Sequence, residues 1–342
     1  MAAAVMDTAI HRGELPPSEV YRRFARIEAH GSSDVYEDWA ANVAEDAEVL
    51  ELVAGLPRTK RQPNLVFAAA RLHGAAGTYA SFRSTLVERW GTIRETILAR
   101  STQTNEAARC AVLLPFLAEL PQPLALLEVG ASAGLCLLPD RYSYRYSDGP
   151  RLDPADGPSE VIIDCRLGPG SAPPRALPKV AWRAGIDLSP VDVENAEDCT
   201  WLETLIWPGH VDRRDRLRSA LAIARREPPR VIAGDLNEAL PALAAEAPAD
   251  ATLVVFHTAV LAYLDEAARG GFVDLVNSLP GHWISNEGPG VLPQLPSLPE
   301  SVAPGEFVIT VDGIPRATAD PHGRSVTGIH PLGGVIGVQF EV

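Results

Sequence analysis

A short apolar run ends in a glycine-rich turn at residues 124–135, which read LALLEVGASAGL. A nearly continuous apolar run of this length is typical of a parallel strand that is buried on both faces. The turn holds only glycine, alanine and serine, and the apolar residues that follow it predict a helix. Small residues let a backbone come close to a ligand, and the N–H groups of a helix start favour electronegative groups. We therefore expect a central parallel strand whose carboxyl end faces a ligand.

Further strands are predicted after this turn, and helical stretches separate several of them. The predicted strands are residues 142–146, 161–165, 180–187, 231–233, 253–256, 283–285, 307–311 and 335–342. The predicted helices are residues 191–206, 213–225, 239–247 and 261–279. Strands that alternate with helices indicate an α/β fold with a mostly parallel sheet. No helix separates the last two strands, so we expect them to form an antiparallel pair at one sheet edge.

The residues before the turn have helical spacing instead. Apolar residues recur at helical intervals from Val20 to Ile97, without the alternation of a strand. We predict an N-terminal helical domain at residues 1–103 and a Rossmann-like domain at residues 104–342. Residues 139–179 are rich in glycine, proline and aspartate and are predicted to form a β-rich insertion, either a flexible lid or a plain surface excursion.

Composition excludes several classes of partner. The chain has 30 lysine and arginine residues against 44 aspartate and glutamate residues, a formal net charge of −14. Such a surface repels phosphate backbones, so we expect no nucleic-acid partner. No stretch reaches the roughly 18 apolar residues of a membrane span, and we expect no membrane partner. The four cysteines form no C-x-x-C pair and residues 1–10 do not resemble a signal peptide, so we expect no metal and a cytoplasmic location.

Acidic residues lie at or beside the ends of three predicted strands. Glu128 stands two residues before the first glycine of the turn, where it can pair with an ammonium group or with ribose hydroxyls. Asp187 ends the next strand within the run GIDLSP, where an acid suits two ribose hydroxyls. Asp235 follows Gly234 after a third strand. The alternative for Asp187 and Asp235 is a helix cap, and for the small turn residues it is close packing.

The turn and these acids resemble the motifs of class I S-adenosylmethionine-dependent methyltransferases. The pattern [DE]-x-G-x-x-x-G is similar to their first motif, and the acids at the next two strands are similar to their ribose and adenine contacts. The resemblance implies S-adenosylmethionine as cofactor, held by residues that we list as Glu128, Gly130, Ala131, Ser132, Gly134, Asp187, Leu188, Asp235 and Leu236. The turn departs from the pattern at Ala131 and Ala133, where many methyltransferases have glycine.

Longer stretches resemble an uncharacterised bacterial family, the domain of unknown function 2332. The similarity covers nearly the whole chain and rests on segments that begin at Thr104, Glu128, Gly185, Trp201, Trp207, Gly234 and Val255. It implies a methyltransferase-like Rossmann fold, and it assigns no reaction. No Asn/Asp-Pro-Pro-aromatic motif follows His257, so O-, N- and carboxyl-methylation all remain open.

His257 and Glu287 are the candidate catalytic residues, since each lies at or just past the end of a predicted strand. His257 is placed to orient a substrate or to act as a base, although a structural histidine is an alternative. We expect a small-molecule substrate that Asn286 and Glu287 contact. Tryptophans at positions 201, 207 and 283 are candidates to line its pocket, and burial in the core is the alternative for them. The oligomeric state stays open.

Two other functions fit parts of the same pattern. One is a non-catalytic protein that binds a nucleotide or a partner through a methyltransferase-like fold. The other is a serine hydrolase, because Gly130-x-Ser132-x-Gly134 matches a nucleophile elbow. In that function Asp235 would pair with His257 or His330, and His73-Gly74 would belong to an oxyanion loop.

Overall fold

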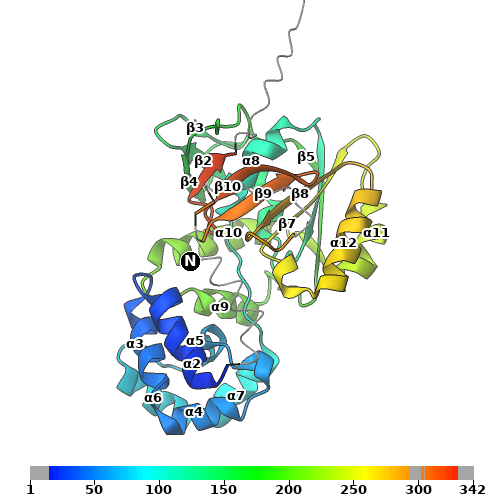
Figure 1. Cartoon of the computed structure of the whole chain (residues 1–342). Coiled ribbons are helices and arrows are strands. Elements are labelled where there is room, and N and C mark those ends of the chain that lie inside the picture. Colours follow the sequence, from blue (N-terminus) through cyan, green and yellow to red (C-terminus); the bar gives the residue numbers. More distant parts are fainter. Residues whose placement is uncertain (1–14, 293–301, 304, 330–342) are drawn as a thin grey trace, which may run out of the picture.

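The computed structural model describes residues 15–292, 302–303 and 305–329. It has a helical part at the amino-terminal end of the described chain and a mixed α/β part built on one large, mostly parallel sheet (Figure 1). Each part has its own hydrophobic core. The exact domain boundary at residue 103 stays a prediction.

The helical part agrees with the helical spacing of its sequence. Its helices are α2 (Pro17–Arg23), α3 (Asp34–Val43), α4 (Ala47–Ala54), α5 (Pro63–Leu72), α6 (Tyr79–Glu88) and α7 (Trp90–Ala99), with a π-helical turn η1 (Phe24–Ala29) and a 3₁₀ turn η2 (Arg58–Lys60). Ser33 and Asp46 cap α3 and α4 by accepting hydrogen bonds from backbone N–H groups. Trp39 stacks on Phe82 with ring centroids 4.5 Å apart, at the centre of an aromatic core.

The sheet contains eleven strands among the described residues, and their order is β3-β2-β4-β11-β10-β9-β8-β7-β1-β5-β6. The strands are β1 (Leu124–Val129), β2 (Ser143–Tyr146), β3 (Arg151–Leu152), β4 (Ile162–Leu167), β5 (Val180–Asp187), β6 (Arg230–Ala233), β7 (Thr252–Thr258), β8 (His282–Glu287), β9 (Phe307–Val311), β10 (Ile314–Ala319) and β11 (Ser325–Gly328). Strand β1 is buried along its whole length, as its apolar run predicts.

Five neighbouring parallel strands form the centre of this sheet. Their spatial order is β6-β5-β1-β7-β8, which is third, second, first, fourth and fifth in chain order, as in doubly wound sheets. The order reverses between β1 and β7. Open sheets of this type bind ligands outside the carboxyl ends of the strands at such a reversal point. We therefore expect the site at this edge of the sheet.

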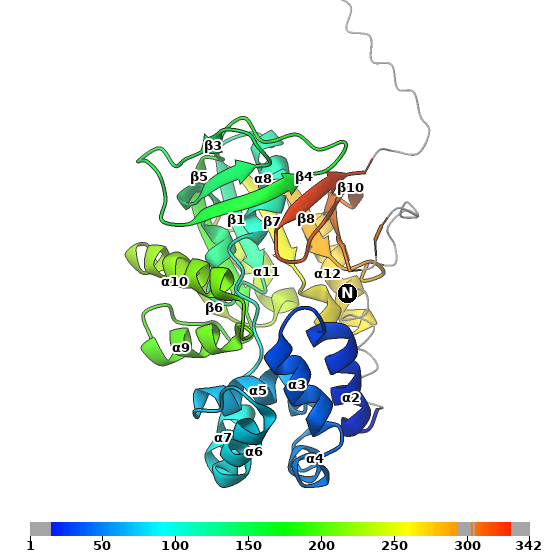
Figure 2. The ribbon, with the colours of Figure 1, turned by 90° about the vertical axis from the view of Figure 1, so that its left-hand side faces the viewer.

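Helices cover both faces of the sheet. They are α8 (Arg109–Glu119), α9 (Ala196–Leu205), α10 (Val211–Arg226), α11 (Leu236–Ala244) and α12 (Glu266–Ser278), with 3₁₀ turns η3 (Leu135–Leu137), η4 (Pro139–Arg141) and η5 (Leu261–Tyr263). Helices α8 and α10 share a core with one face, and α11 and α12 share a core with the other. Figure 2 shows α9 and α10 beside the sheet, with α9 next to the helical part. Among the described residues, no helix is both long and apolar enough to cross a membrane.

The helix predicted directly after the glycine-rich turn is wrong. Gly134 is followed by the short η3 and then by η4, with no α-helix before β2. Pro139 stands five residues after Gly134, lacks a backbone N–H and disfavours the helical conformation in Leu138 before it. The four buried residues 135–138 therefore form only one turn.

The predicted insertion at 139–179 extends the sheet. Strands β2 and β3 form an antiparallel pair, β2 pairs with β4 in parallel, and β4 pairs with β11 of the main sheet. Burial of Tyr142, Tyr144 and Tyr146 against α8 and η4 joins this region to the core. The region is therefore an outer part of the sheet and not a separate lid.

The antiparallel edge is built from other residues than the sequence predicts. Strand β9 forms a hairpin with β10, while the predicted partner at 335–342 lies outside the described residues. Asp312 and Gly313 both have positive φ, of 51° and 75°. An Asp-Gly pair in this conformation is a strong signal for a two-residue hairpin, and the sequence interpretation overlooked it.

Candidate functional site

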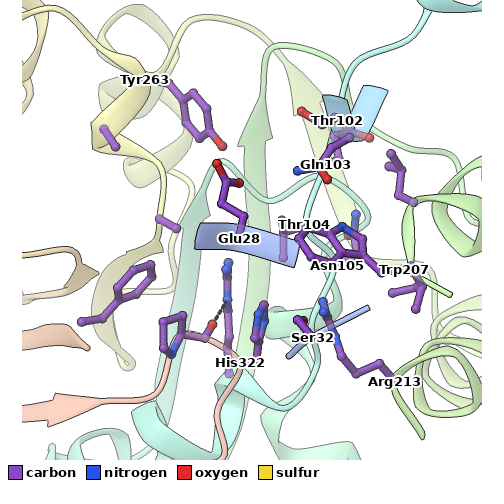
Figure 3. A pocket seen from close by; sticks show the side chains of 18 of the residues that line it. Glu28, Ser32, Thr102, Gln103, Thr104, Asn105, Trp207, Arg213, Tyr263 and His322 are labelled. Carbon is purple, nitrogen blue, oxygen red and sulfur yellow. Dashed lines mark hydrogen bonds between the residues drawn. The ribbon is translucent and has the colours of Figure 1, made fainter. Parts of the chain in front are cut away.

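A cleft of about 970 Å³ lies between the helical part and the carboxyl edge of the sheet. Its walls come from η1, from the connecting segment 102–105, from α9 and α10, from the segment 259–265 after β7, and from residues 305–307 and 320–325. Figure 3 shows Tyr263 on one side of the cleft, Arg213 on the opposite side, and Glu28 and Asn105 between them. The cleft is thus beside the reversal point of the sheet order, where its fold class binds ligands.

The glycine-rich turn is next to this cleft, but partners within the chain already occupy its N–H groups. Gly130 and Ala131 donate to the carbonyl of Ile186, at 2.8 and 3.1 Å. Ser132 N–H donates to Asp187 Oδ2 at 2.8 Å, and Ala133 N–H donates to Asn105 Oδ1 at 3.0 Å. The Gly134 N–H donates to Ala131 O at 2.7 Å. A ligand at these N–H groups would have to replace contacts that the chain makes itself.

The small residues of the turn are also required by packing. Gly130 has φ +72°, and a Cβ there would lie 2.3 Å from Val260 Cγ2. A Cβ on Gly134 would lie 2.7 Å from Cβ of Pro229. These distances are far below contact distance, so the space over each glycine is filled by another side chain. Close packing therefore explains both glycines without a ligand.

Asp187 and Asp235, two of the three strand-end acids, follow neighbouring strands as the sequence predicts, and both accept backbone hydrogen bonds. Gly234 N–H donates to the carbonyl of Asp187 at 3.0 Å, which places the ends of β5 and β6 together. Asp187 Oδ1 accepts from Ser189 N–H at 2.8 Å, in addition to its contact with the turn. Asp235 caps α11 by accepting from Asn237 N–H at 2.8 Å. None of these acids is among the residues that line the cleft.

The apolar residues beside the two acids have opposite environments. Leu188 is 78% exposed. Leu236 is buried in the core beneath α11. Leu188 is therefore an open apolar surface next to Asp187, while Leu236 is a packing residue.

Glu128 is buried on the sheet face that α8 covers. It is 4% exposed, and its Oε2 atom has no hydrogen-bond partner among the described residues. Burial raises its pKa well above the usual range, and nearby Cys136 and Asp187 act in the same direction while Arg109 opposes them. Burial thus favours the neutral form of this carboxyl group over its charged form.

The two candidate catalytic residues form a buried cluster below the cleft wall. His257 Nδ1 contacts Glu287 Oε1 at 2.8 Å, and Trp283 donates its indole N–H to His257 Nε2 at 3.0 Å. Glu287 Oε1 also accepts from the N–H groups of Val260 and Leu261, at 2.7 and 2.9 Å. Neither His257 nor Glu287 lines the cleft. Glu287, which His257 contacts, fixes the start of the segment 259–265, which does line it.

The three predicted tryptophans also differ in whether they line the cleft. Trp207 lines the cleft, whereas Trp201 packs in the helical core and Trp283 packs against Phe272 in the sheet core. Asn286 is fully buried within β8, and both of its amide atoms lack hydrogen-bond partners among the described residues. Only Trp207 among these residues is therefore placed to contact a ligand directly.

The elements of a hydrolase are not assembled at Ser132. Its φ of 50° fits a nucleophile elbow, but no helix follows, and its Oγ accepts from Asn105 Nδ2 at 2.9 Å. No histidine of the described residues forms a hydrogen bond with Ser132, and both ring nitrogens of His257 are engaged elsewhere. His73 contacts Thr96 in the helical part, and His330 lies outside the described residues.

Arg109 is the residue of the site that the sequence interpretation passed over. It is 6% exposed, lines the cleft, and donates to Pro321 O, Thr258 O and Thr258 Oγ1 at 2.9, 3.1 and 3.2 Å. Among the described residues, no carboxylate lies within 4.0 Å of it. The only sequence signal was its place in the run that starts at Thr104.

A second cationic group is adjacent to Arg109. Glu106 is 4% exposed and contacts Arg213 at 2.8 Å and Arg216 at 2.9 Å. Burial raises the pKa of Glu106, but the two guanidinium groups outweigh it, so the pKa is lower than usual. One carboxylate is therefore the counterion of two arginines, and Arg213 also lines the cleft.

Two histidines complete this end of the cleft. Burial, together with the positive charges of Arg213 and Arg109, lowers the pKa of His322 to about 3. Its Nδ1 atom is buried and has no partner in the described part of the chain. Burial and Arg213 also lower the pKa of His210, which contacts Ser32 O at 2.9 Å. Both rings are therefore neutral at physiological pH.

Cys136 lies near Glu128 and donates to the backbone carbonyl of Glu106 at 3.6 Å, but no cysteine of the described residues lines the cleft. All four are buried free thiols, and burial is the main reason that the pKa of Cys165 rises to about 12. Within the described ranges, no group of three or more His, Cys, Asp or Glu side chains is arranged to hold a metal ion.

Comparison with known proteins gives a family and no activity. The family model described as an uncharacterized protein conserved in bacteria, DUF2332, matches residues 18–327. No curated protein and no solved structure matches the chain. The matched range includes the helical part, all described strands up to β11 and the whole lining of the cleft. The chain belongs to this family of uncharacterised bacterial proteins.

Proposed function

We propose that the chain is an S-adenosylmethionine-dependent methyltransferase that acts on a small molecule bound in the cleft. The observation that carries the proposal is the convergence of three strand ends. The turn after β1, Asp187 at the end of β5 and Asp235 after β6 are neighbours at one edge of a doubly wound sheet. Sheets of this type bind nucleotide-containing ligands at this edge.

Two side chains at this edge fit the cofactor. Leu188 exposes 78% of its surface beside Asp187, which suits the face of an adenine ring. The buried Oε2 atom of Glu128 has no partner in the described residues and can accept a hydrogen bond from the cofactor. When bound, the cofactor would supply an electrophilic methyl group for transfer to a nucleophile of the substrate.

The residues of the chain would contribute binding and positioning. Trp207 and Tyr263 line the cleft and would hold an acceptor near the strand ends. His257 and Glu287 act as positioning residues, because they fix the backbone of Val260 and Leu261. Holding two reactants in the correct geometry supplies much of the acceleration in such transfers.

A second candidate function is a binding protein that uses the cleft without a cofactor at the turn. The specific observation in its favour is the closed turn, where Asp187 and Asn105 occupy N–H groups and Val260 covers Gly130. Such a protein would keep the sheet for its architecture and would bind its ligand between the two parts of the molecule.

The compartment and partner class follow from charge and thiols. The four buried free cysteines are compatible with a reducing compartment, and we infer a cytoplasmic location. The net charge of −14 opposes binding to nucleic acid, so we infer a small-molecule acceptor.

Calorimetry with S-adenosylmethionine and S-adenosylhomocysteine tests the proposal. The variant Leu188→Ala removes an exposed side chain, so the fold should be retained while the affinity for both compounds falls about 10-fold. Ile314→Ala is the matched control, because Ile314 is 62% exposed in the distant β9–β10 hairpin. If the unaltered protein binds neither compound, the methyltransferase proposal fails and the second candidate remains.

A further inference from the structure

The strongest unexplained feature of the molecule is the arginine corner of the cleft, which we define as Arg109, Arg213, His210 and His322. All four side chains line the same cavity. They come from the start of α8, from α10 and its preceding turn, and from the loop between β10 and β11. Figure 3 shows Arg213 and His322 on the side of the cleft away from Tyr263.

The arginine corner carries uncompensated positive charge. Arg109, Arg213 and the adjacent Arg216 provide three guanidinium groups, and Glu106 is the one carboxylate that contacts any of them among the described residues. Within the described part of the chain, two of these positive charges therefore have no counterion. Arg324 adds none, since it contacts both carboxylate oxygens of Asp320.

The neighbouring acid forms no ion pair with Arg109 among the described residues. Glu128 is close enough to interact electrostatically with Arg109, but its buried Oε2 atom has no hydrogen-bond partner there, and burial raises the pKa of its carboxyl group well above the usual range. In the described ranges, Arg109 has only carbonyl and hydroxyl acceptors, from Pro321 and Thr258. Buried charges in proteins are normally paired, because desolvation of a lone ion costs several kcal/mol. An arginine in this state at the wall of a cavity is suited to an anionic ligand.

The two histidines strengthen the same conclusion. Because the pKa of each ring is lowered, each is neutral and adds no repulsion to the guanidinium groups. A neutral imidazole can donate an N–H to an anion, and His322 Nδ1 is buried without a partner in the described residues. A guanidinium group binds planar carboxylates and phosphates through paired N–H donors.

We propose that the arginine corner binds the carboxylate or phosphate group of the small-molecule substrate. The rest of that molecule then extends along the cleft toward Tyr263. The assignment to the methyl acceptor rests on the proposed function, whereas binding of the anion does not require it. The acceptor class is therefore an anionic metabolite-sized molecule.

The experiment is thermal unfolding and calorimetry of the full chain with succinate and with inorganic phosphate, at constant ionic strength maintained with chloride. We expect at least one of the two probes to raise the unfolding temperature and to bind. In Arg109→Gln that probe should lose about 10-fold or more in affinity, as expected for charge-assisted hydrogen bonds. Arg218→Gln is the control on α10, since Arg218 is exposed and contacts Glu203.

The two probes distinguish the two chemistries. Preference for succinate assigns a carboxylate, and preference for phosphate assigns a phosphoryl group. The proposal is overturned if neither probe affects the unaltered protein, or if Arg109→Gln and Arg218→Gln respond alike. The stability test on the unaltered protein remains decisive if Arg109→Gln does not fold.

Titration of S-adenosylhomocysteine into the same proteins separates this proposal from the proposed function. Retained affinity for it in Arg109→Gln, with loss of succinate or phosphate binding, supports an acceptor site. Loss of both would assign the arginine corner to the carboxylate of the cofactor and would overturn the acceptor assignment. Binding of the anion without any binding of S-adenosylhomocysteine would reject the methyltransferase and retain the anion site.

Discussion

The glycine-rich turn, which contacts Asn105 at the wall of the cleft, and the arginine corner of the same cleft differ in how completely their polar groups are satisfied. At the turn, each N–H from Gly130 to Gly134 has an acceptor within the chain. At the arginine corner, Arg109 has no carboxylate and His322 Nδ1 has no partner among the described residues. The glycine-rich turn, which resembles a known motif, is thus the region whose polar groups are more fully hydrogen-bonded. A buried polar group without a partner requires an explanation, and at the wall of a cleft a ligand is one.

The largest expected effect comes from Glu106→Gln, which breaks the ion pairs beside the arginine corner. The change leaves Arg213 and Arg216 without a counterion in a largely buried position. Loss of one partner of a buried pair costs about 3–5 kcal/mol, so the free energy of unfolding should fall by this amount. Urea denaturation measures it.

The control for Glu106→Gln is Glu246→Gln, at the exposed pair with Arg230. Its urea midpoint should be unchanged, because solvent screens that pair. If the two variants lost the same free energy of unfolding, the arginine corner would not be desolvated. It would then not differ from the glycine-rich turn in the way stated above.

Gly130→Ala tests whether the turn is closed by packing. Positive φ costs about 1–2 kcal/mol for a residue with a Cβ, and the clash with Val260 adds about 1–3 kcal/mol. Gly313→Ala should show only the first cost, because φ is +75° there and nothing lies within 4 Å of its Cβ. Val260→Ala should partly restore Gly130→Ala. Equal losses at both glycines would mean that open space lies over the turn.

Acid should destabilise the protein through His322. Its folded pKa of about 3 is below the unfolded value of 6.5, so the unfolded chain binds more protons between these values. The charged groups that face it are Arg213, Arg109, Glu106 and Asp320. Stability should fall by about 1.4 kcal/mol per pH unit as pH drops below 6.5. Urea titrations of His322→Gln should lack this slope, and an unchanged slope would assign it to other groups.

The smallest effect is expected at Ser132, the residue on which the hydrolase alternative depends. Ser132→Ala removes the hydrogen bond from Asn105 and should cost about 1 kcal/mol of stability. A fluorophosphonate should not label Ser132 in the unaltered protein, since no described histidine forms a hydrogen bond with it. If mass spectrometry detected labelled Ser132, the result would support the serine hydrolase alternative.

Much of the fold was predictable because burial leaves a local pattern. The apolar run at 124–129 predicted β1, and the prediction for residues 180–187 matches β5 in its bounds. The helix after the turn failed because Pro139 outweighs four apolar residues that otherwise favour a helix. The β9–β10 hairpin was missed although Asp312 and Gly313 are a local signal for it.

The sequence by itself determined β1, the order of strands and helices from β5 to β8, the acids at the strand ends and the family to which the chain belongs. These depend on residues that are close together along the chain. Only the tertiary structure decided that Asn105 closes the turn from 27 residues away and that Arg109 contacts Thr258 from 149 residues away. Whether a buried charge has a counterion depends on every neighbour in space, and no stretch of sequence contains that set.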